Sequence, residues 1–95
     1  MNLYISDTAQ TKMRDVAEFV DELNLPGAGD RWIERLIDFL LDHSKLDNVQ
    51  WQLCNNVALA SKFYSCLQYN GWVIAFRIEY GEFRVYDFIH GSLLT

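Results

Sequence analysis

Four side chains near the end of the chain could perform acid–base chemistry on a phosphate ester: Arg77, Arg84, Tyr86 and His90. A tyrosine and a histidine can activate the 2′-hydroxyl of RNA and protonate the leaving oxygen without a metal ion. Arginines can stabilise the charge that develops on the phosphate oxygens. They can also hold carboxylates through paired hydrogen bonds, so these residue types fit either RNA cleavage or the binding of an acidic partner.

Each of these residues also has a structural interpretation. The arginines can pair with Glu79 and Glu82 on an exposed strand surface. Tyr86 and His90 can be a cross-strand aromatic residue and a strand-terminal histidine. Lys62 is expected to form an ion pair with Glu79 rather than to act as a catalytic cation. The sequence has no Gly-rich phosphate loop, no Cys/His metal pattern and no Ser-His-Asp order, so we expect no cofactor and no metal.

The relative positions of these side chains depend on two predicted turns. Asn70-Gly71 is a strong hairpin signal, and Tyr80-Gly81 is a second candidate turn. Two-residue turns at both places predict three consecutive antiparallel strands and fix their register. The predicted pairs across the first turn are Tyr69 with Trp72, Leu67 with Ile74, Ser65 with Phe76, and Phe63 with Ile78. Those across the second turn are Ile78 with Phe83, Phe76 with Val85, Ile74 with Asp87, and Trp72 with Ile89.

This register predicts a sheet with two unlike faces. The paired residues form one almost wholly apolar face, which is expected to be the floor of the core. The opposite face is mixed; it is expected to carry His90, and a row of Tyr64, Arg77 and Arg84 crosses it. Two arginines that face each other repel, so either glutamates neutralise them or they bind an anion. An apolar strip on this face suits a partner: Val73, Ala75, Tyr86 and Phe88. The residues expected to contact the partner are Tyr64, Arg77, Arg84, Tyr86 and Phe88.

The first half of the chain predicts a short strand at residues 3–5 and two amphipathic helices. The first helix is expected to start at an Asp7 cap and to end at the Pro-Gly segment that follows it. Its apolar residues recur at intervals of three and four: Ala9, Met13, Val16, Val20 and Leu23. The second helix is expected to be capped by Gly29 or Asp30 and to run to about His43. Its apolar stripe is Ile33, Leu36, Ile37 and Leu40.

The remaining segment and the two cysteines give weaker signals. Residues 44–56 have no clear period and stay unassigned, with Trp51 and Leu53 suggesting a buried or lid-like connection. Cys54 and Cys66 lack metal-ligand spacing, and they are expected to be free, buried thiols in a reducing compartment. The N-terminal residues lack the features of a signal peptide, and no stretch approaches the ~20 apolar residues of a membrane span. We therefore expect a cytoplasmic protein without a membrane partner.

Composition and charge narrow the class of protein. Ninety-five residues, 51% of them hydrophobic, predict a single domain over 1–95 with its own core. Residues 1–49 hold ten acidic and five basic side chains, and the rest of the chain holds three of each. This acidic half would repel nucleic acid, so direct nucleic-acid binding is not expected. An acidic stripe on the first helix is expected to be a solvated surface rather than a cation site: Asp15, Glu18, Asp21 and Glu22. The order of elements predicts an α+β two-layer domain with a helical hairpin on one face of an antiparallel sheet and the other face open.

The chain resembles the RelE/ParE superfamily of bacterial type II toxin–antitoxin toxins over nearly its whole length. The resemblance rests on the length, the β-α-α-β-β-β order and the small-residue linker before the second helix. ParE-like members often have an aromatic-Arg pair in the penultimate strand, as Phe76-Arg77, and end on an apolar-His-Gly sequence, as Ile89-His90-Gly91. The resemblance implies a cognate antitoxin as partner, typically one that wraps the toxin. For the ParE-like branch it implies DNA gyrase as a target.

Members of this family are usually basic, whereas this chain has a net charge of −5, and many of them are ribonucleases that act on the ribosome. They often carry arginines where this chain has Val73, Asp87 and Ser92. Without these cations the charge around a scissile phosphate would be poorly stabilised, which argues against cleavage. We therefore expect a toxin-like protein that acts by binding an antitoxin and DNA gyrase. A ribosome-dependent, metal-independent mRNA endoribonuclease that uses the four residues named first is the alternative, and a non-toxic interaction module is the third hypothesis. A homodimer is another way to cover the apolar strip.

Overall fold

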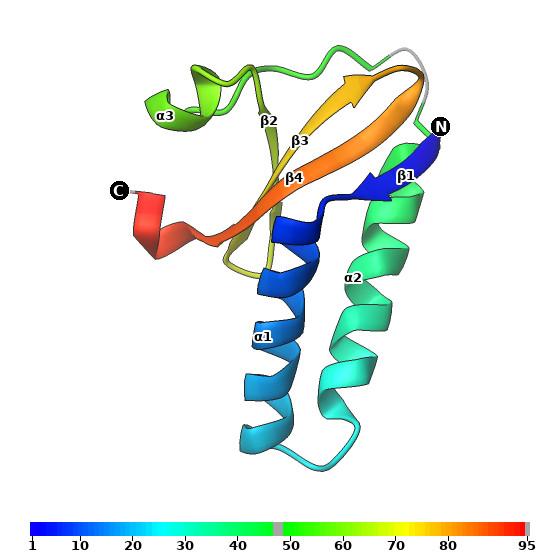
Figure 1. Cartoon of the computed structure of the whole chain (residues 1–95), viewed down its shortest axis with the longest axis vertical. Coiled ribbons are helices and arrows are strands. Elements are labelled where there is room, and N and C mark those ends of the chain that lie inside the picture. Colours follow the sequence, from blue (N-terminus) through cyan, green and yellow to red (C-terminus); the bar gives the residue numbers. More distant parts are fainter. Residues whose placement is uncertain (47–48, 95) are drawn as a thin grey trace.

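The computed structural model describes residues 1–46 and 49–94 as an α+β domain with a four-stranded mixed sheet. Two long helices extend side by side from the sheet (Figure 1). In chain order the elements are β1 (Asn2–Ile5), α1 (Asp7–Leu23), α2 (Ala28–Ser44), α3 (Val57–Ala60), β2 (Ser65–Tyr69), β3 (Trp72–Glu79), β4 (Glu82–His90) and the short 3₁₀ helix η1 (Gly91–Leu94). The strand order is β1-β4-β3-β2, with β1 parallel to β4. The expectation of a purely antiparallel sheet is therefore wrong, because the first strand joins the last one in parallel.

The capping residue of α1 is Ser6 rather than Asp7. The Ser6 hydroxyl oxygen accepts a hydrogen bond from the backbone N–H of Ala9, at 3.2 Å. Asp7 instead lies in the first turn, where a carboxylate interacts favourably with the helix dipole. The Ser6 N–H also donates to the carbonyl of Val85 in β4, at 2.9 Å. This residue therefore joins the start of the helix to the sheet.

α2 packs closely on α1 because glycines begin it. Gly27 is the N-cap with a φ of +90°, so the predicted caps Gly29 and Asp30 are wrong. A Cβ at Gly29 would collide with the backbone carbonyl of Ala17 in α1. The Gly29 N–H donates to Oδ1 of Asp21 at 2.8 Å, which fixes the crossing of the two helices.

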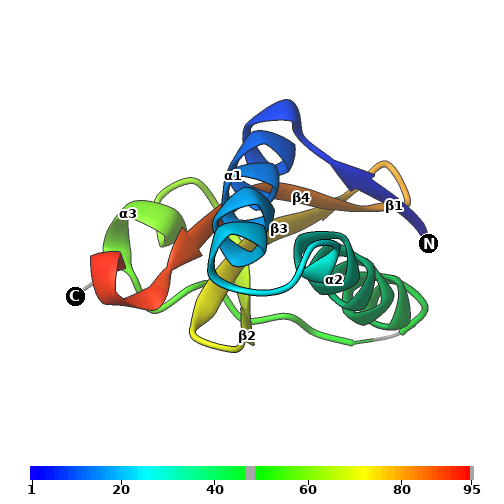
Figure 2. The ribbon, with the colours of Figure 1, turned by 90° about the horizontal axis from the view of Figure 1, so that it is seen from below.

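The main core lies between α1, α2 and one face of the sheet, and Figure 2 looks along the two helices that cover it. The helices contribute Ala9, Met13, Leu36 and Leu40. The sheet contributes Ile74, Phe76, Phe83, Val85 and Phe88. Complete burial of a large apolar side chain stabilises a fold by about 1.5–3 kcal/mol, so this face holds the hairpin and the sheet together.

Both predicted turns are confirmed. Asn70, Gly71, Tyr80 and Gly81 all have positive φ, as two-residue type I′ turns require. The confirmed pairs are Tyr69 with Trp72, Leu67 with Ile74, Ser65 with Phe76, Ile78 with Phe83, and Phe76 with Val85. The predicted pair of Phe63 with Ile78 is wrong, because β2 begins only at Ser65.

A β-bulge in β4 makes the rest of the predicted register wrong. The register shifts between Ala75 and Phe76, where Tyr86 is an extra residue in β4. Every residue of β4 beyond this point changes face relative to the prediction. The observed pairs are Ala75 with Asp87, Ile74 with Phe88, Val73 with Ile89, and Trp72 with His90. The predicted pairs of Ile74 with Asp87 and of Trp72 with Ile89 are not formed.

The second face of the sheet is partly covered rather than open. Cys54 forms a disulfide with Cys66 of β2, so the prediction of free thiols is wrong. Leu59 of α3 packs with Cys54 and Ala75 in a second, smaller cluster. Figures 1 and 2 show α3 and η1 lying near each other, away from α2. The open part of this face is therefore limited to the end of the sheet nearest the Tyr80-Gly81 turn.

The C-terminal part of the connection at 44–56 lies beside the start of β2. Residues 47 and 48 lie outside the described part of the chain. Leu53 forms an isolated antiparallel bridge with Ser65, and the Trp51 ring packs edge-on against Phe76 with centroids 5.2 Å apart. The sequence contained the apolar residues of this connection but no periodicity from which its path could be predicted.

Candidate functional site

The predicted pair of facing arginines exists, and aromatic residues surround it. Arg77 of β3 lies opposite Arg84 of β4, and Tyr4 of β1 lies opposite Arg84 on its other side. These residues lie on the face of the sheet away from α1 and α2, since their neighbours in the strands form the core. The row was predicted from Tyr64 to Arg84; β1 extends it to Tyr4. We call the whole set the aromatic–arginine row: Tyr4, Tyr64, Arg77, Tyr80, Arg84 and Tyr86.

Each guanidinium of the row lies over two tyrosine rings. The Cζ of Arg77 is 5.3 Å from the centroid of Tyr64 and 4.7 Å from that of Tyr86. The two rings are themselves stacked, with centroids 5.5 Å apart. The Cζ of Arg84 is 4.2 Å from the centroid of Tyr4 and 5.7 Å from that of Tyr80. Cation–π contacts at partly exposed sites contribute about 0.5–1 kcal/mol each, which offsets the repulsion between the arginines.

The neighbouring glutamates neutralise the row incompletely. The Nε of Arg77 is 2.8 Å from Oε1 of Glu79, and the Nε of Arg84 is 3.9 Å from Oε1 of Glu82. Both contacts are ion pairs without hydrogen-bond geometry, and each Nε is buried with no aligned hydrogen-bond acceptor in the described structure. A buried donor left unsatisfied costs about 1–3 kcal/mol, and more when it is charged. The Arg77 and Arg84 side chains nevertheless remain 33% and 22% exposed, so part of each guanidinium group stays accessible to a carboxylate.

Glu79 is held by Arg77 and Tyr86 rather than by Lys62, which was its predicted partner. The Tyr86 hydroxyl donates a hydrogen bond to Oε1 of Glu79 at 2.7 Å. Nη1 of Arg77 donates to the backbone carbonyl of Lys62 at 3.2 Å. The Arg77 side chain therefore ties β3 to the segment that precedes β2.

The pKa of Tyr86 makes this residue a poor general base. Burial is the first cause that raises its pKa above the ordinary value, and its hydrogen bond to Glu79 raises it further, while Arg77 lowers it. The pKa of Arg77 is also raised, chiefly by its hydrogen bond with Tyr86. Tyr86 therefore stays a neutral phenol near neutral pH, and it acts as a hydrogen-bond donor to Glu79.

His90 does not join the other candidate catalytic residues. After the bulge it pairs with Trp72, and its ring meets the Trp72 ring edge-on with centroids 5.0 Å apart. Its Nδ1 lies 2.8 Å from the Ser92 hydroxyl oxygen. His90 thus lies on the Trp72 side of the sheet, whereas Tyr86 lies with Tyr64 on the opposite side. The prediction that His90 shares a face with the arginines is wrong.

Phe88 lies in the core and cannot contact a partner. It is 1% exposed, and its ring stacks on Trp72 with centroids 4.6 Å apart. The bulge that displaced His90 also moved this residue to the helix side. Val73 and Ala75, predicted to form an open strip with it, pack in the cluster around Cys54. Of the residues expected to contact a partner, the row keeps Tyr64, Arg77, Arg84 and Tyr86.

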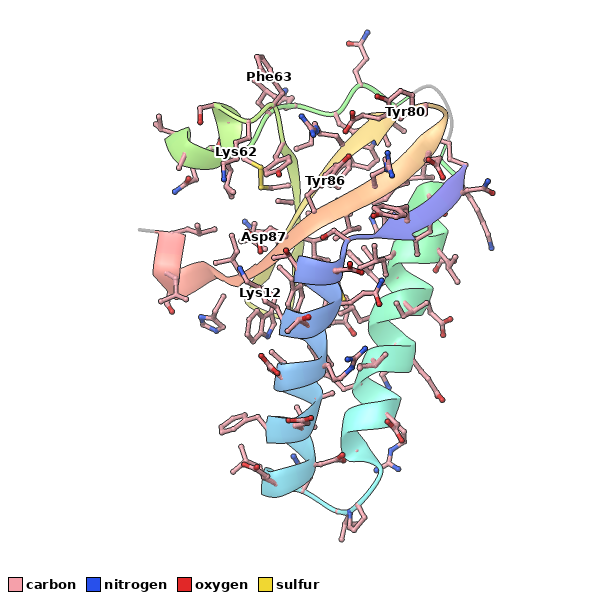
Figure 3. All side chains as sticks on the ribbon, viewed as in Figure 1. Lys12, Lys62, Phe63, Tyr80, Tyr86 and Asp87 are labelled. Carbon is pink, nitrogen blue, oxygen red and sulfur yellow. A yellow bond between two sulfur atoms is a disulfide. The ribbon has the colours of Figure 1, made fainter. Side chains whose placement is uncertain are left out.

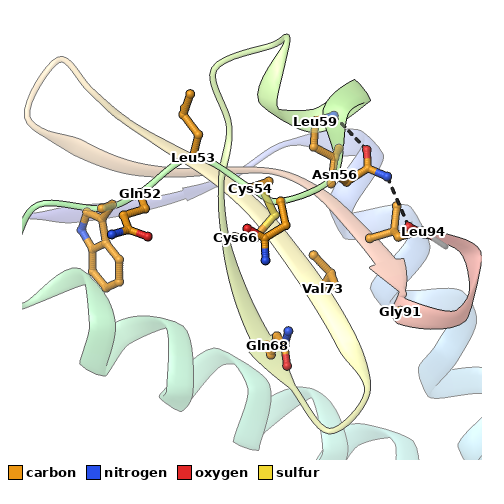
Figure 4. Close-up of a pocket in the computed structure, with 12 residues that line it drawn as sticks. Gln52, Leu53, Cys54, Asn56, Leu59, Cys66, Gln68, Val73, Gly91 and Leu94 are labelled. Atoms are coloured by element: carbon orange, nitrogen blue, oxygen red, sulfur yellow. Dashed lines mark hydrogen bonds between the residues drawn. A yellow bond between two sulfur atoms is a disulfide. The ribbon is translucent and has the colours of Figure 1, made fainter.

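A hollow of about 420 Å³ lies beside the disulfide (Figure 4). The side chains of Gln52, Asn55 and Gln68 line its walls. Asn56 also contributes, but its side chain is engaged: it accepts from the Leu59 N–H and donates to the Leu94 carbonyl. No charged side chain lines this hollow, so its chemistry suits a neutral group rather than the ions that the row would bind.

A second hollow of about 430 Å³ adjoins Arg77, and sequence reasoning missed it. Its walls include Leu53, Phe63 and Ile78. Phe63 has a φ of +61° and is 71% exposed. A left-handed conformation costs a residue with a Cβ about 1–2 kcal/mol, and burial of this ring does not offset it. Figure 3 places Phe63 and Tyr80 at the end of the sheet away from the helical hairpin. No signal in the sequence marks this conformation, because glycine is the residue expected there.

Within residues 1–46 and 49–94, no group of three or more His, Cys, Asp or Glu side chains could hold a metal ion. None of the helices in this part of the chain is long and apolar enough to cross a membrane. The chain matches no protein-family model, and no curated protein shows significant sequence similarity to it.

Proposed function

We propose that this chain is a toxin-like protein of the RelE/ParE kind whose aromatic–arginine row binds carboxylates of its protein partners, the cellular target and the antitoxin. The observation that carries the proposal is the pair of facing arginines, whose side chains stay 33% and 22% exposed beside their glutamates. Carboxylates of a partner would bind the part of each guanidinium that remains exposed. A hydrogen bond to a charged group contributes about 1.5–3 kcal/mol, so loss of either arginine would weaken such a complex about tenfold or more.

The local charge supports an acidic partner segment at the row. Asp87, the third acidic residue of the C-terminal half, forms an ion pair with Lys12 of α1 at 2.6 Å. Around the row this leaves Lys62 and the two arginines against Glu79 and Glu82. The surface therefore has a positive balance in a chain whose net charge is −5.

The proposal takes DNA gyrase, implied by the resemblance, as the candidate target in the bacterial cytoplasm, and in that reducing compartment the Cys54–Cys66 pair is expected to be at least partly reduced. We do not propose the ribonuclease alternative, because His90 is on the other side of the sheet and Tyr86 is held in its neutral form. A non-toxic interaction module would use the same row. Bacterial growth after expression of the chain distinguishes the two, because a toxin arrests growth and an interaction module does not.

The test is bacterial growth after tightly induced expression of the chain. We expect the wild type to arrest growth and Arg77→Ala/Arg84→Ala to relieve the arrest. Arg14→Ala/Arg35→Ala removes the same number of arginines from the exposed surfaces of α1 and α2, and it should remain toxic. Circular dichroism of each purified variant must show the wild-type fold. Normal growth with folded wild-type protein would contradict toxicity, and equal arrest by the row variant would contradict the role of the row.

A further inference from the structure

Among the residues that the structure describes, none pairs with the edge of β3 at Ile78, where β2 has already ended. Counting in twos from the closing pair of Tyr69 and Trp72, the hydrogen-bonded positions of β3 that face β2 are 72, 74, 76 and 78. The last observed partner is Ser65, opposite Phe76. The backbone N–H and C=O of Ile78 therefore point toward the position that an additional strand would occupy.

Phe63 explains why β2 stops. It follows α3 in a Schellman arrangement, in which the N–H of Tyr64 donates to the carbonyl of Leu59 and the N–H of Phe63 donates to that of Ala60. This motif places Phe63 at the left-handed position where glycine is normally found. The chain therefore turns away from β3, and an exposed aromatic ring stands beside the vacant edge. A strained residue whose ring is not buried points to a function for that ring.

The hollow beside this edge combines three kinds of contact. Ile78 offers backbone groups, while the rings and methyl groups of Phe63 and Leu53 offer apolar surface. Arg77 supplies a cation in the wall of the same hollow. An extended peptide with an apolar side chain and a neighbouring carboxylate would use all three. A lysine-rich peptide would meet the positive balance around Arg77 instead.

We infer that this hollow, the β3-edge groove, binds an extended segment of a partner protein that adds a strand to β3 at Ile78, seats an apolar side chain against Phe63 and places a carboxylate on Arg77. The inference rests on the proposed function, because it specifies where and in what conformation the acidic partner lies. It makes Phe63 a binding residue that is unfavourable for the stability of the free protein.

The experiment is selection of a phage-displayed library of random short peptides on the full-length protein, followed by affinity measurements with the enriched peptide. We expect enriched peptides to combine apolar and acidic residues. Phe63→Gly should weaken their binding at least about tenfold while the melting temperature stays at or above the wild-type value. Phe19→Ala removes an equally aromatic, 58% exposed side chain from α1 and should leave the affinity unchanged.

The outcomes separate this inference from the proposed function. Arg84 belongs to the row but does not line the groove, so Arg84→Ala reports on the row alone. Enriched peptides that lose affinity in Arg84→Ala and keep it in Phe63→Gly would overturn the groove and leave the row standing. Failure to enrich any peptide, enrichment of basic peptides, or a melting temperature that falls in Phe63→Gly would also overturn the groove. The growth test of the row does not depend on any of these results.

Discussion

At the scale of single residues, the two facing arginines show how a sheet can hold like charges together. Two tyrosine rings beside each guanidinium provide the attraction that two imperfectly aligned glutamates do not. Tyr86 has a central part in this arrangement, since it contacts Arg77 through its ring and Glu79 through its hydroxyl. This double contact predicts how stability changes at high pH.

The raised pKa of Tyr86 predicts a loss of stability above pH 10. The folded protein holds the phenol in its neutral form more strongly than the unfolded chain does. Its contribution to the free energy of unfolding is therefore complete below the unfolded pKa of about 10 and declines as the pH rises toward the higher folded value. Urea unfolding of the wild type and of Tyr86→Phe across this range should show their difference shrinking above pH 10. A constant difference would contradict the shift.

The positions of Arg77 and Arg84 could be predicted because Asn70-Gly71 and Tyr80-Gly81 mark two-residue turns, which the structure confirms by their positive φ. The turn fixes the register, and the alternation of side chains along each strand then assigns the two arginines to one face. The positions of Phe88 and His90 could not be predicted in this way. The extra residue, Tyr86, is an ordinary strand residue, and nothing in its neighbours signals a bulge. The predicted assignment of β4 side chains to the two faces of the sheet is therefore correct up to Val85 and reversed from Asp87 onward.

At the scale of elements, the bulge decides which side of β4 belongs to the core. It brings Phe88 under the helices, where Trp32 meets it edge-on at 5.8 Å and Trp72 stacks on it. The same strand carries Arg84 on the other face, before the bulge. One strand therefore serves both the core and the row.

Phe88→Ala should destabilise the fold severely. Removing a completely buried phenylalanine costs about 3–5 kcal/mol, through lost burial and the cavity that remains. Urea unfolding should show this loss, whereas Phe19→Ala should change the free energy of unfolding by no more than about 0.5 kcal/mol. If Phe88→Ala kept the wild-type stability and weakened partner binding, the burial of Phe88 in the core would be contradicted, and the residue would belong to the partner-binding surface.

Sequence patterns predicted the long helices and missed α3. The stripes of α1 and α2 repeat over several turns, so they identify a helix even though both capping residues were misplaced. α3 has only four residues, Val57–Ala60, which is too short to show a period. The disulfide was missed for a related reason: the spacing of Cys54 and Cys66 does not reveal that α3 folds one back onto the other.

At the scale of the whole molecule, the disulfide joins the connection around residue 54 to the sheet. It closes a loop with a sequence separation of 12, and a loop of this size stabilises a fold by about 2–3 kcal/mol when oxidised. Reduction should therefore lower the melting temperature by about 10 °C or more. The measurement is a thermal scan with and without dithiothreitol, and Cys54→Ser/Cys66→Ser should not respond to the reductant. Two free thiols in the untreated protein would contradict the bond.

The parallel pairing of β1 with β4 has a consequence for synthesis. The Ser6 hydroxyl donates to the carbonyl of Tyr86, a contact between residues 80 positions apart. A nascent chain therefore exposes β1 and the apolar faces of both long helices until almost all of the protein has left the ribosome. Pairing of such distant segments is slow, because loop closure must precede any gain from the contact. The sheet is therefore expected to be completed only after translation has delivered β4, so that final folding follows synthesis rather than accompanying it.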